Sequence, residues 1–187
     1  MGKLFENLHL TLLAGLVAAI ALMMTFHAET LTAVAAFRYL HIFFGILWIG
    51  LLYYFNFVQI PTMPSIPAEL KPGVGKYIAP KALFFFRWGA ALTVLTGLIV
   101  AMLSAYLVEA LTLQPQVRLI GIGMWLALIM AFNVWFIIWP AQRKILGLIE
   151  ASAEEKARLA PRALAASRTN VLLSLPMLYC MVSANLG

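Results

Sequence analysis

The residues with the clearest chemical potential lie together in the apolar run that begins near residue 36. At about 100° of rotation per residue, one stripe of a helix would carry Arg38, His41, Gly45, Trp48 and Leu52. An imidazole ligates iron, a glycine one turn away lets a flat macrocycle approach the backbone, and an arginine near the membrane interface pairs with a propionate. This combination suits a haem, so we take His41 as the first candidate iron ligand.

A second axial ligand is expected from the preceding apolar run. His27 ends that run, and because two successive spans run in opposite directions, it should lie on the same side of a membrane as His41. His27 is therefore the predicted second ligand of a b-type haem, and Met23 or Met24, one turn deeper, are the alternatives. The competing interpretation is that the histidines are interfacial polar residues and that the methionines pack or face lipid.

The composition sets the elements that must position these side chains. Hydrophobic residues make up 64% of the 187 residues and charged residues 11%, which excludes a soluble domain. Uncharged stretches of about membrane length recur along the chain. We predict one all-α integral membrane domain, residues 1–187, with a cytoplasmic surface helix at about 142–160. The five expected transmembrane helices span about 8–26, 36–58, 83–107, 117–139 and 166–186.

The basic residues predict the orientation of this five-helix bundle. With the N-terminus on one side, only Arg38 and Arg118 of the thirteen fall on the other. By the positive-inside rule the N-terminus is cytoplasmic and the C-terminus periplasmic, as in a multi-pass protein of the bacterial inner membrane. Anionic lipid headgroups account for the net charge of +6, so no nucleic-acid partner is expected. The eleven residues on the cytoplasmic side are Lys3, Lys71, Lys76, Lys81, Arg87, Arg143, Lys144, Lys156, Arg158, Arg162 and Arg168.

Several motifs are absent from the sequence, and this narrows the chemistry. The chain has a single cysteine, Cys180, so it lacks the paired cysteines of a covalent c-type haem and the cluster that iron and sulfur require. It also lacks a Gly-rich nucleotide loop and a His-Glu-x-x-His zinc motif. No acidic residue lies within an expected span, which argues against a Ser/His/acid triad.

Three separated blocks of the sequence form a recognisable pattern: Arg38–His41 with Gly45–Gly50 and Tyr53–Phe55, then Ala131–Val134 with Ile138–Lys144, and finally Asn170–Asn185. In this order, the blocks resemble the membrane domain of the bacterial cytochrome-c-linked urate oxidases. The second expected span also resembles the haem-dependent membrane protoporphyrinogen oxidases, with Arg38 where those usually have lysine. The resemblance implies a helical redox protein that passes electrons to a c-type cytochrome, and it favours haem at His41.

Three functional hypotheses follow from these residues and this resemblance. The first is an inner-membrane electron-transfer subunit with haem b, exchanging electrons with a periplasmic cytochrome c. The second is a cofactor-free accessory subunit of a larger respiratory or oxygenase complex. The third is an enzyme similar to the urate or porphyrinogen oxidases; here the chain departs from the urate oxidase pattern, with Thr169 at the place of a histidine and Ala184–Asn185 in place of a closing Asn-His pair.

Overall fold

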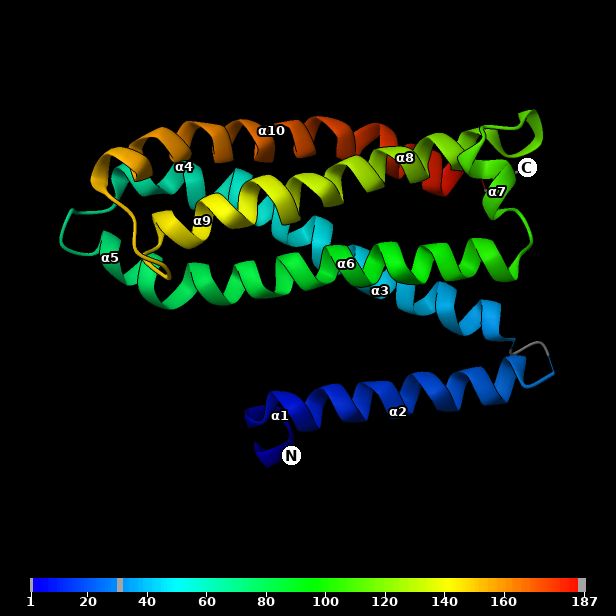
Figure 1. Ribbon diagram of the computed structural model, residues 1–187. Coiled ribbons are helices and arrows are strands. Elements are labelled where there is room, and N and C mark those ends of the chain that lie inside the picture. Colours follow the sequence, from blue (N-terminus) through cyan, green and yellow to red (C-terminus); the bar gives the residue numbers. More distant parts are fainter. Residues whose placement is uncertain (1, 30–31, 185–187) are drawn as a thin grey trace. The chain divides into compact units, whose positions relative to one another are not determined.

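The computed structural model describes residues 2–29 and 32–184, and for Lys3 and His27 it describes the backbone alone. The described residues form helices and turns without any strand, which confirms the all-α fold class (Figure 1). The chain divides into two units, residues 1–36 and 37–187. The α-helices are α1 (Gly2–Glu6), α2 (Leu8–His27), α3 (Ala33–Tyr53), α4 (Ile60–Thr62), α5 (Lys71–Gly73), α6 (Ala79–Leu103), α7 (Leu107–Leu111), α8 (Arg118–Phe132), α9 (Trp139–Ile145) and α10 (Ala153–Ser183).

The first unit consists mainly of α2, a helix of 20 residues without an Asp, Glu, Lys or Arg side chain. Asn7 starts it: the Asn7 side-chain oxygen accepts hydrogen bonds from the backbone N–H groups of His9 and Leu10 at 3.0 and 3.2 Å. An N-cap of this kind satisfies donors that would otherwise lack a partner at the first turn.

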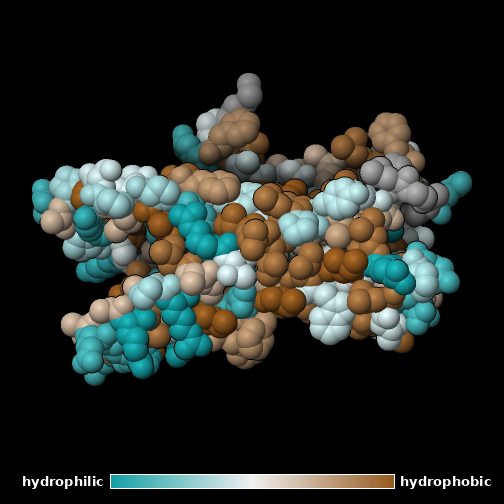
Figure 2. All heavy atoms as spheres, turned by 90° about the horizontal axis from the view of Figure 1, so that it is seen from above, coloured by the Kyte–Doolittle hydropathy of each residue, from teal (hydrophilic) through white to brown (hydrophobic). Residues whose placement is uncertain are grey.

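Four stretches of helix are long and apolar enough to cross a membrane, which indicates membrane association. They contain most or all of the first four expected spans. The fifth expected span, about 166–186, falls largely within α10. In the described part of the chain, α10 is not one of the four stretches that are long and apolar enough. On the face of α8 and α10 seen in Figure 2, hydrophobic side chains cover the middle of the helices and hydrophilic ones gather toward the ends. The four stretches are Leu8–Phe26, Ala33–Ser65, Lys71–Leu103 and Pro115–Ile145.

The expected surface helix at about 142–160 is replaced in the structure by a helix end, a turn and a new helix start. Gly147 adopts φ +73°, a left-handed conformation that stops α9. Ser152 then caps α10, with its hydroxyl oxygen accepting the Glu155 backbone N–H at 3.1 Å. The prediction of one continuous surface helix rested on the helical spacing of the apolar residues. It is wrong because Gly147 ends one helix and Ser152 begins the next.

Prolines mark the joints between the remaining segments. Three π-helical turns, η1 (Tyr54–Gln59), η3 (Val74–Ile78) and η5 (Asn133–Ile138), are each followed two residues later by a proline. Proline lacks a backbone N–H and its ring pushes against the carbonyl one turn back, so a locally widened turn before it relieves the clash. The helical path therefore continues past Pro61, Pro80 and Pro140.

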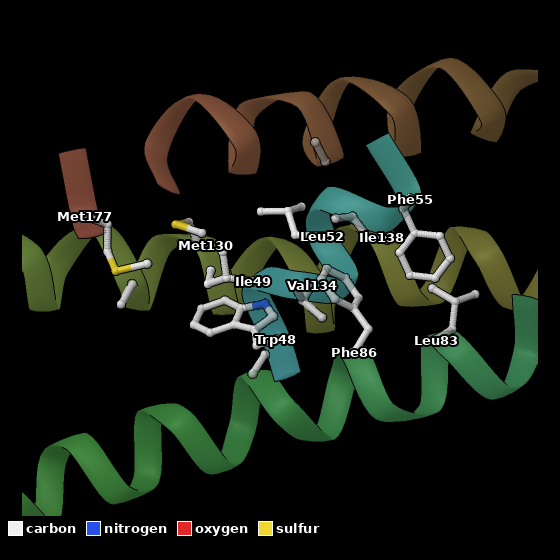
Figure 3. Packing of buried hydrophobic residues seen from close by; sticks show 13 residues of the cluster. Trp48, Ile49, Leu52, Phe55, Leu83, Phe86, Met130, Val134, Ile138 and Met177 are labelled. Atoms are coloured by element: carbon white, nitrogen blue, oxygen red, sulfur yellow. The ribbon is translucent and has the colours of Figure 1, made fainter. Parts of the chain in front are cut away.

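The second unit has a packed core, which includes a close crossing of α3 and α6. A Cβ on Gly89 of α6 would lie 3.3 Å from the backbone nitrogen of Trp48, a tight contact that the glycine avoids. Trp48 and Leu52 are fully buried in a cluster that also includes Phe86 and Met130, from α6 and α8 (Figure 3). This core fixes the side of α3 that faces the other helices.

Candidate functional site: a cavity between four helices

A cavity of about 640 Å³ lies within the second unit, between α3, α6, α8 and α10. All four residues predicted on the α3 stripe as cofactor contacts line it: Arg38, His41, Gly45 and Trp48. Most of the remaining lining is aliphatic or thioether side chain. The sequence therefore predicted one wall of this cavity. All residues of that wall lie on one helix, in which the rotation per residue is known.

The imidazole of His41 is fixed by a hydrogen bond to α6. Its Nδ1 lies 2.8 Å from the backbone carbonyl oxygen of Thr93. A carbonyl oxygen only accepts, so Nδ1 carries the proton and donates, and Nε2 keeps its lone pair. No described residue hydrogen-bonds Nε2. A histidine that donates one ring N–H to a carbonyl and leaves the other nitrogen bare is arranged as metal-ligating histidines are.

Gly97 provides the space that His41 occupies. A Cβ at that position would lie 2.8 Å from Cε1 and 2.9 Å from Nδ1 of the His41 ring. The ring therefore packs directly on the backbone of α6, which sets its orientation. Gly45, one turn further along α3, faces Thr93, and a Cβ there would have ordinary contact at 3.8 Å from the Thr93 methyl group. Gly45 thus lines the cavity without being required for the helix crossing.

Arg38 and Tyr106 supply polar groups at one end of the cavity. Arg38 is exposed, whereas Tyr106, which follows the end of α6, is partly buried. Burial raises the pKa of the Tyr106 hydroxyl, and the positive charge of Arg38 partly opposes this rise. The phenol therefore stays protonated at neutral pH beside a cation, and together they offer donors to an anionic group. Sequence reasoning missed Tyr106 because it lies between helices.

A buried polar network adjoins the cavity on α10. The Asn170 amide donates to the Met130 carbonyl at 3.0 Å, and its side-chain oxygen accepts from the Asn133 amide at 2.9 Å. Farther along α10, the Ser174 hydroxyl lies 3.0 Å from the hydroxyl of Tyr53, which lines the cavity. The sequence signal for this network was the helical spacing of three polar residues on one face of an apolar helix, namely Ser167, Asn170 and Ser174.

The other predicted ligands belong to the first unit. The side chain of His27 lies outside the described part of the structure, and Met23 and Met24 are on the same helix, α2. Their ligand roles remain predictions. Within the second unit, the thioethers of Met124 and Met177 line the same cavity as His41, which the sequence analysis did not anticipate. They were missed because nothing in the sequence relates the rotation of α8 and α10 to that of α3.

Two observations bear on which metals the protein can hold. The described residues contain no group of three or more His, Cys, Asp or Glu side chains placed to bind an ion. A porphyrin brings four nitrogen ligands of its own and needs only one or two from the protein. The donors lining this cavity therefore fit a haem better than a bare transition metal.

A comparison with known protein families gives a match in the C-terminal part of the chain. The model of the family "Urate oxidase N-terminal" matches residues 110–187. Over these residues, the predicted resemblance to the urate oxidase membrane domain is confirmed. No curated protein and no solved structure shows significant similarity to the chain. The segment matched by the urate oxidase N-terminal family includes α8 and α10, so it supplies two of the four cavity walls, while His41 on α3 lies outside it.

Proposed function

We propose that the protein is a b-type haem electron-transfer subunit of the bacterial inner membrane, with the haem in the cavity between α3, α6, α8 and α10. The observation that supports this proposal most strongly is the hydrogen bonding of the His41 imidazole. Its Nδ1 donates to the Thr93 carbonyl, and its Nε2 has no hydrogen-bond partner among the described residues and adjoins a largely apolar cavity. When bound, a haem supplies reversible one-electron exchange at its iron.

The residues present fit such a group in three respects. The cavity volume of about 640 Å³ lies within the range of roughly 300–1,000 Å³ that is usual for cofactor sites. Gly45 leaves the α3 wall without a side chain next to His41. Arg38 and the protonated Tyr106 provide a cation and a donor for carboxylates at one end. In this proposal His41 is the axial ligand and Trp48 forms part of the inner wall.

The second axial position is proposed for His27, with Met23 or Met24 as the alternatives on the same helix. The thioethers of Met124 and Met177 add a further possibility within the second unit, since both line the cavity. Spectroscopy separates these cases: His27→Ala should give a high-spin, five-coordinate spectrum if His27 is the ligand. An unchanged spectrum would mean that one of these methionines is the second ligand, which Met→Leu substitutions would then test.

The same proposal includes five spans with a cytoplasmic N-terminus, so that α10 crosses the membrane and ends in the periplasm. In that orientation Arg38 and Tyr106 lie on the periplasmic side. A haem whose carboxylates face that side is placed to exchange electrons with a periplasmic cytochrome c. The positive-inside distribution of lysine and arginine supports this orientation.

A reduced-minus-oxidised absorption spectrum of the purified protein tests the proposal. We expect the α-band of a b-type haem in the native protein and its loss in His41→Ala. His9→Ala is the matched control, because His9 is an exposed histidine at the start of α2 and should leave the band unchanged. A native protein that shows no α-band after expression with haem supply would contradict the proposal and favour a cofactor-free accessory subunit.

The family match favours a second candidate function, that of a urate-oxidase-like enzyme. The matched segment supplies α8 and α10 to the cavity, so the family's sequence pattern and the proposed site coincide in part. Turnover of urate by the purified membrane protein with added cytochrome c would support this function. Porphyrinogen is the alternative substrate to assay, since α3 resembles the second family; absence of both activities would count against an oxidase of either kind.

A further inference from the structure

Two arginines meet at a tryptophan-rich corner formed by α6, η5 and α9. The guanidinium carbon of Arg87 lies 3.9 Å from the centre of the Trp139 ring and 5.1 Å from that of Trp135. The guanidinium carbon of Arg143 lies 5.9 Å from the same Trp139 ring. Trp88 packs edge-on against Trp135 at 5.6 Å between ring centres. Both cations are therefore held against rigid aromatic side chains.

Neither arginine has a carboxylate partner among the described residues. The Nε atoms of Arg87 and Arg143 are both buried and have no hydrogen-bond partner. The one ion pair among the described residues joins Glu155 to Lys144 and involves neither arginine. Two neighbouring guanidinium groups that are partly buried and have no counter-ion repel each other and lose hydration, and the contacts with the tryptophan rings offset these costs only in part. An anion between them would remove both costs.

The corner lies at the depth of the lipid headgroups. Arg87 immediately precedes the uncharged stretch of α6, and Arg143 immediately follows the uncharged stretch that begins at Leu119 and contains Trp139. Tryptophan is enriched at this level, where an apolar ring with a polar edge fits best. The positive-inside distribution assigns the corner to the cytoplasmic leaflet, whose anionic lipids attract basic residues.

We propose that Arg87 and Arg143 form a binding site for the phosphate of an anionic phospholipid, with Trp135 and Trp139 as its floor. A guanidinium presents a planar fork of N–H donors that matches two phosphate oxygens, and two forks on adjacent helices enclose one phosphate. The acyl chains of a lipid would continue along the apolar surfaces of α6, α8 and η5, where Phe85, Phe132 and Phe136 are exposed. This continuity favours a lipid over free phosphate. The proposal does not depend on the haem.

Native mass spectrometry of the detergent-purified protein measures this site directly, with cardiolipin and phosphatidylglycerol as probes and phosphatidylcholine for comparison. We expect the Arg87→Gln, Arg143→Gln double variant to bind the anionic lipids at least tenfold more weakly than the native protein. The matched control is Arg158→Gln, Arg162→Gln, which removes two exposed arginines of α10 and the same net charge. Quenching of tryptophan fluorescence by lipids with brominated acyl chains should show the same ranking.

The outcomes distinguish a specific lipid-binding site from a general attraction of basic residues to anionic lipids. Equal weakening in both double variants, or unchanged binding in the first, would overturn the proposal. Inorganic phosphate that competes at the same concentration as lipid would overturn the lipid assignment. If the Gln double variant does not fold, Arg87→Lys with Arg143→Lys keeps both charges but removes the planar forks; severalfold weaker lipid binding is then expected, and unchanged binding would contradict the site.

Discussion

At the scale of single residues, Gly97 decides how His41 is presented. Alanine at position 97 would place a Cβ 2.8 Å from Cε1 of the imidazole, so the ring must move away from α6 and lengthen its 2.8 Å hydrogen bond to Thr93. We expect Gly97→Ala to destabilise the protein by about 1–3 kcal/mol, the usual cost of overpacking. The haem content per protein should fall at the same time, and pyridine haemochrome analysis together with thermal unfolding measures both.

Gly15→Ala provides the control for that substitution. Nothing lies within 4 Å of a Cβ built on Gly15, which is also inside a helix. The control should keep its haem and its unfolding temperature. Normal haem content in a folded Gly97→Ala variant would show that the position of the ring does not matter, which would contradict the assignment of His41 as a ligand held by Thr93.

A second residue-scale prediction concerns the amide pair at the α8–α10 contact. Asn170→Ala removes the acceptor for Asn133 and the donor for the Met130 carbonyl, both in a buried setting. Unpaired polar groups in a membrane interior are costly, so we expect a loss of about 1–2 kcal/mol in unfolding free energy. The double-mutant cycle with Asn133→Ala should show coupling between the two sites. Additive losses would contradict the pairing, and Thr25→Ala, at an exposed position, should be near neutral.

At the scale of elements, α7 is a short helix whose position depends on one glycine. A Cβ on Gly121 of α8 would lie 2.2 Å from the carbonyl oxygen of Ala110, a backbone atom that cannot rotate away. The chain also enters and leaves α7 through two left-handed residues, Ala105 at φ 56° and Leu113 at φ 57°. Since non-glycine residues in that conformation cost about 1–2 kcal/mol, α7 has little tolerance for further strain.

Gly121→Ala should therefore displace α7 and lower the unfolding free energy by about 3 kcal/mol or more. Hydrogen exchange followed by mass spectrometry should show faster exchange over residues 105–113 than in the native protein. Gly50→Ala is the matched control, because a Cβ there meets nothing within 4 Å. Equal exchange in α7 for both variants would show that the Gly121–Ala110 contact does not hold the helix.

The α3 wall of the cavity was predictable from the sequence, and the other walls were not. On one helix, rotation per residue alone places Arg38, His41, Gly45 and Trp48 on a common face, and all four line the cavity. The partner of the imidazole, the Thr93 carbonyl, is a backbone atom of another helix, and no side-chain pattern marks it. The mutual rotation of α3 and α6 is set by close contacts at Gly89 and Gly97, which only three-dimensional packing reveals.

At the scale of the whole molecule, charge and hydropathy predicted the membrane class and the first four spans, but not the course of α10. Pro161 and Pro176 lie inside that helix, and Ser167, Asn170 and Ser174 make its buried face polar. An average of hydropathy over a window of α10 is therefore lower than in the four apolar stretches, although its polar groups bond to neighbouring helices. Polar residues that pair across helices are invisible to hydropathy alone.

Cysteine labelling of intact cells tests the arrangement of the whole chain in the membrane. The native protein has one cysteine, Cys180, which is buried, so it gives a low background. Ser65 and Gln114 are exposed, and the proposed topology places them on opposite sides. A membrane-impermeant maleimide should label Gln114→Cys from outside and Ser65→Cys only after permeabilisation. Labelling in the reverse order would invert the bundle, which would put the Arg38 and Tyr106 end of the cavity on the cytoplasmic side and remove the case for a periplasmic electron partner.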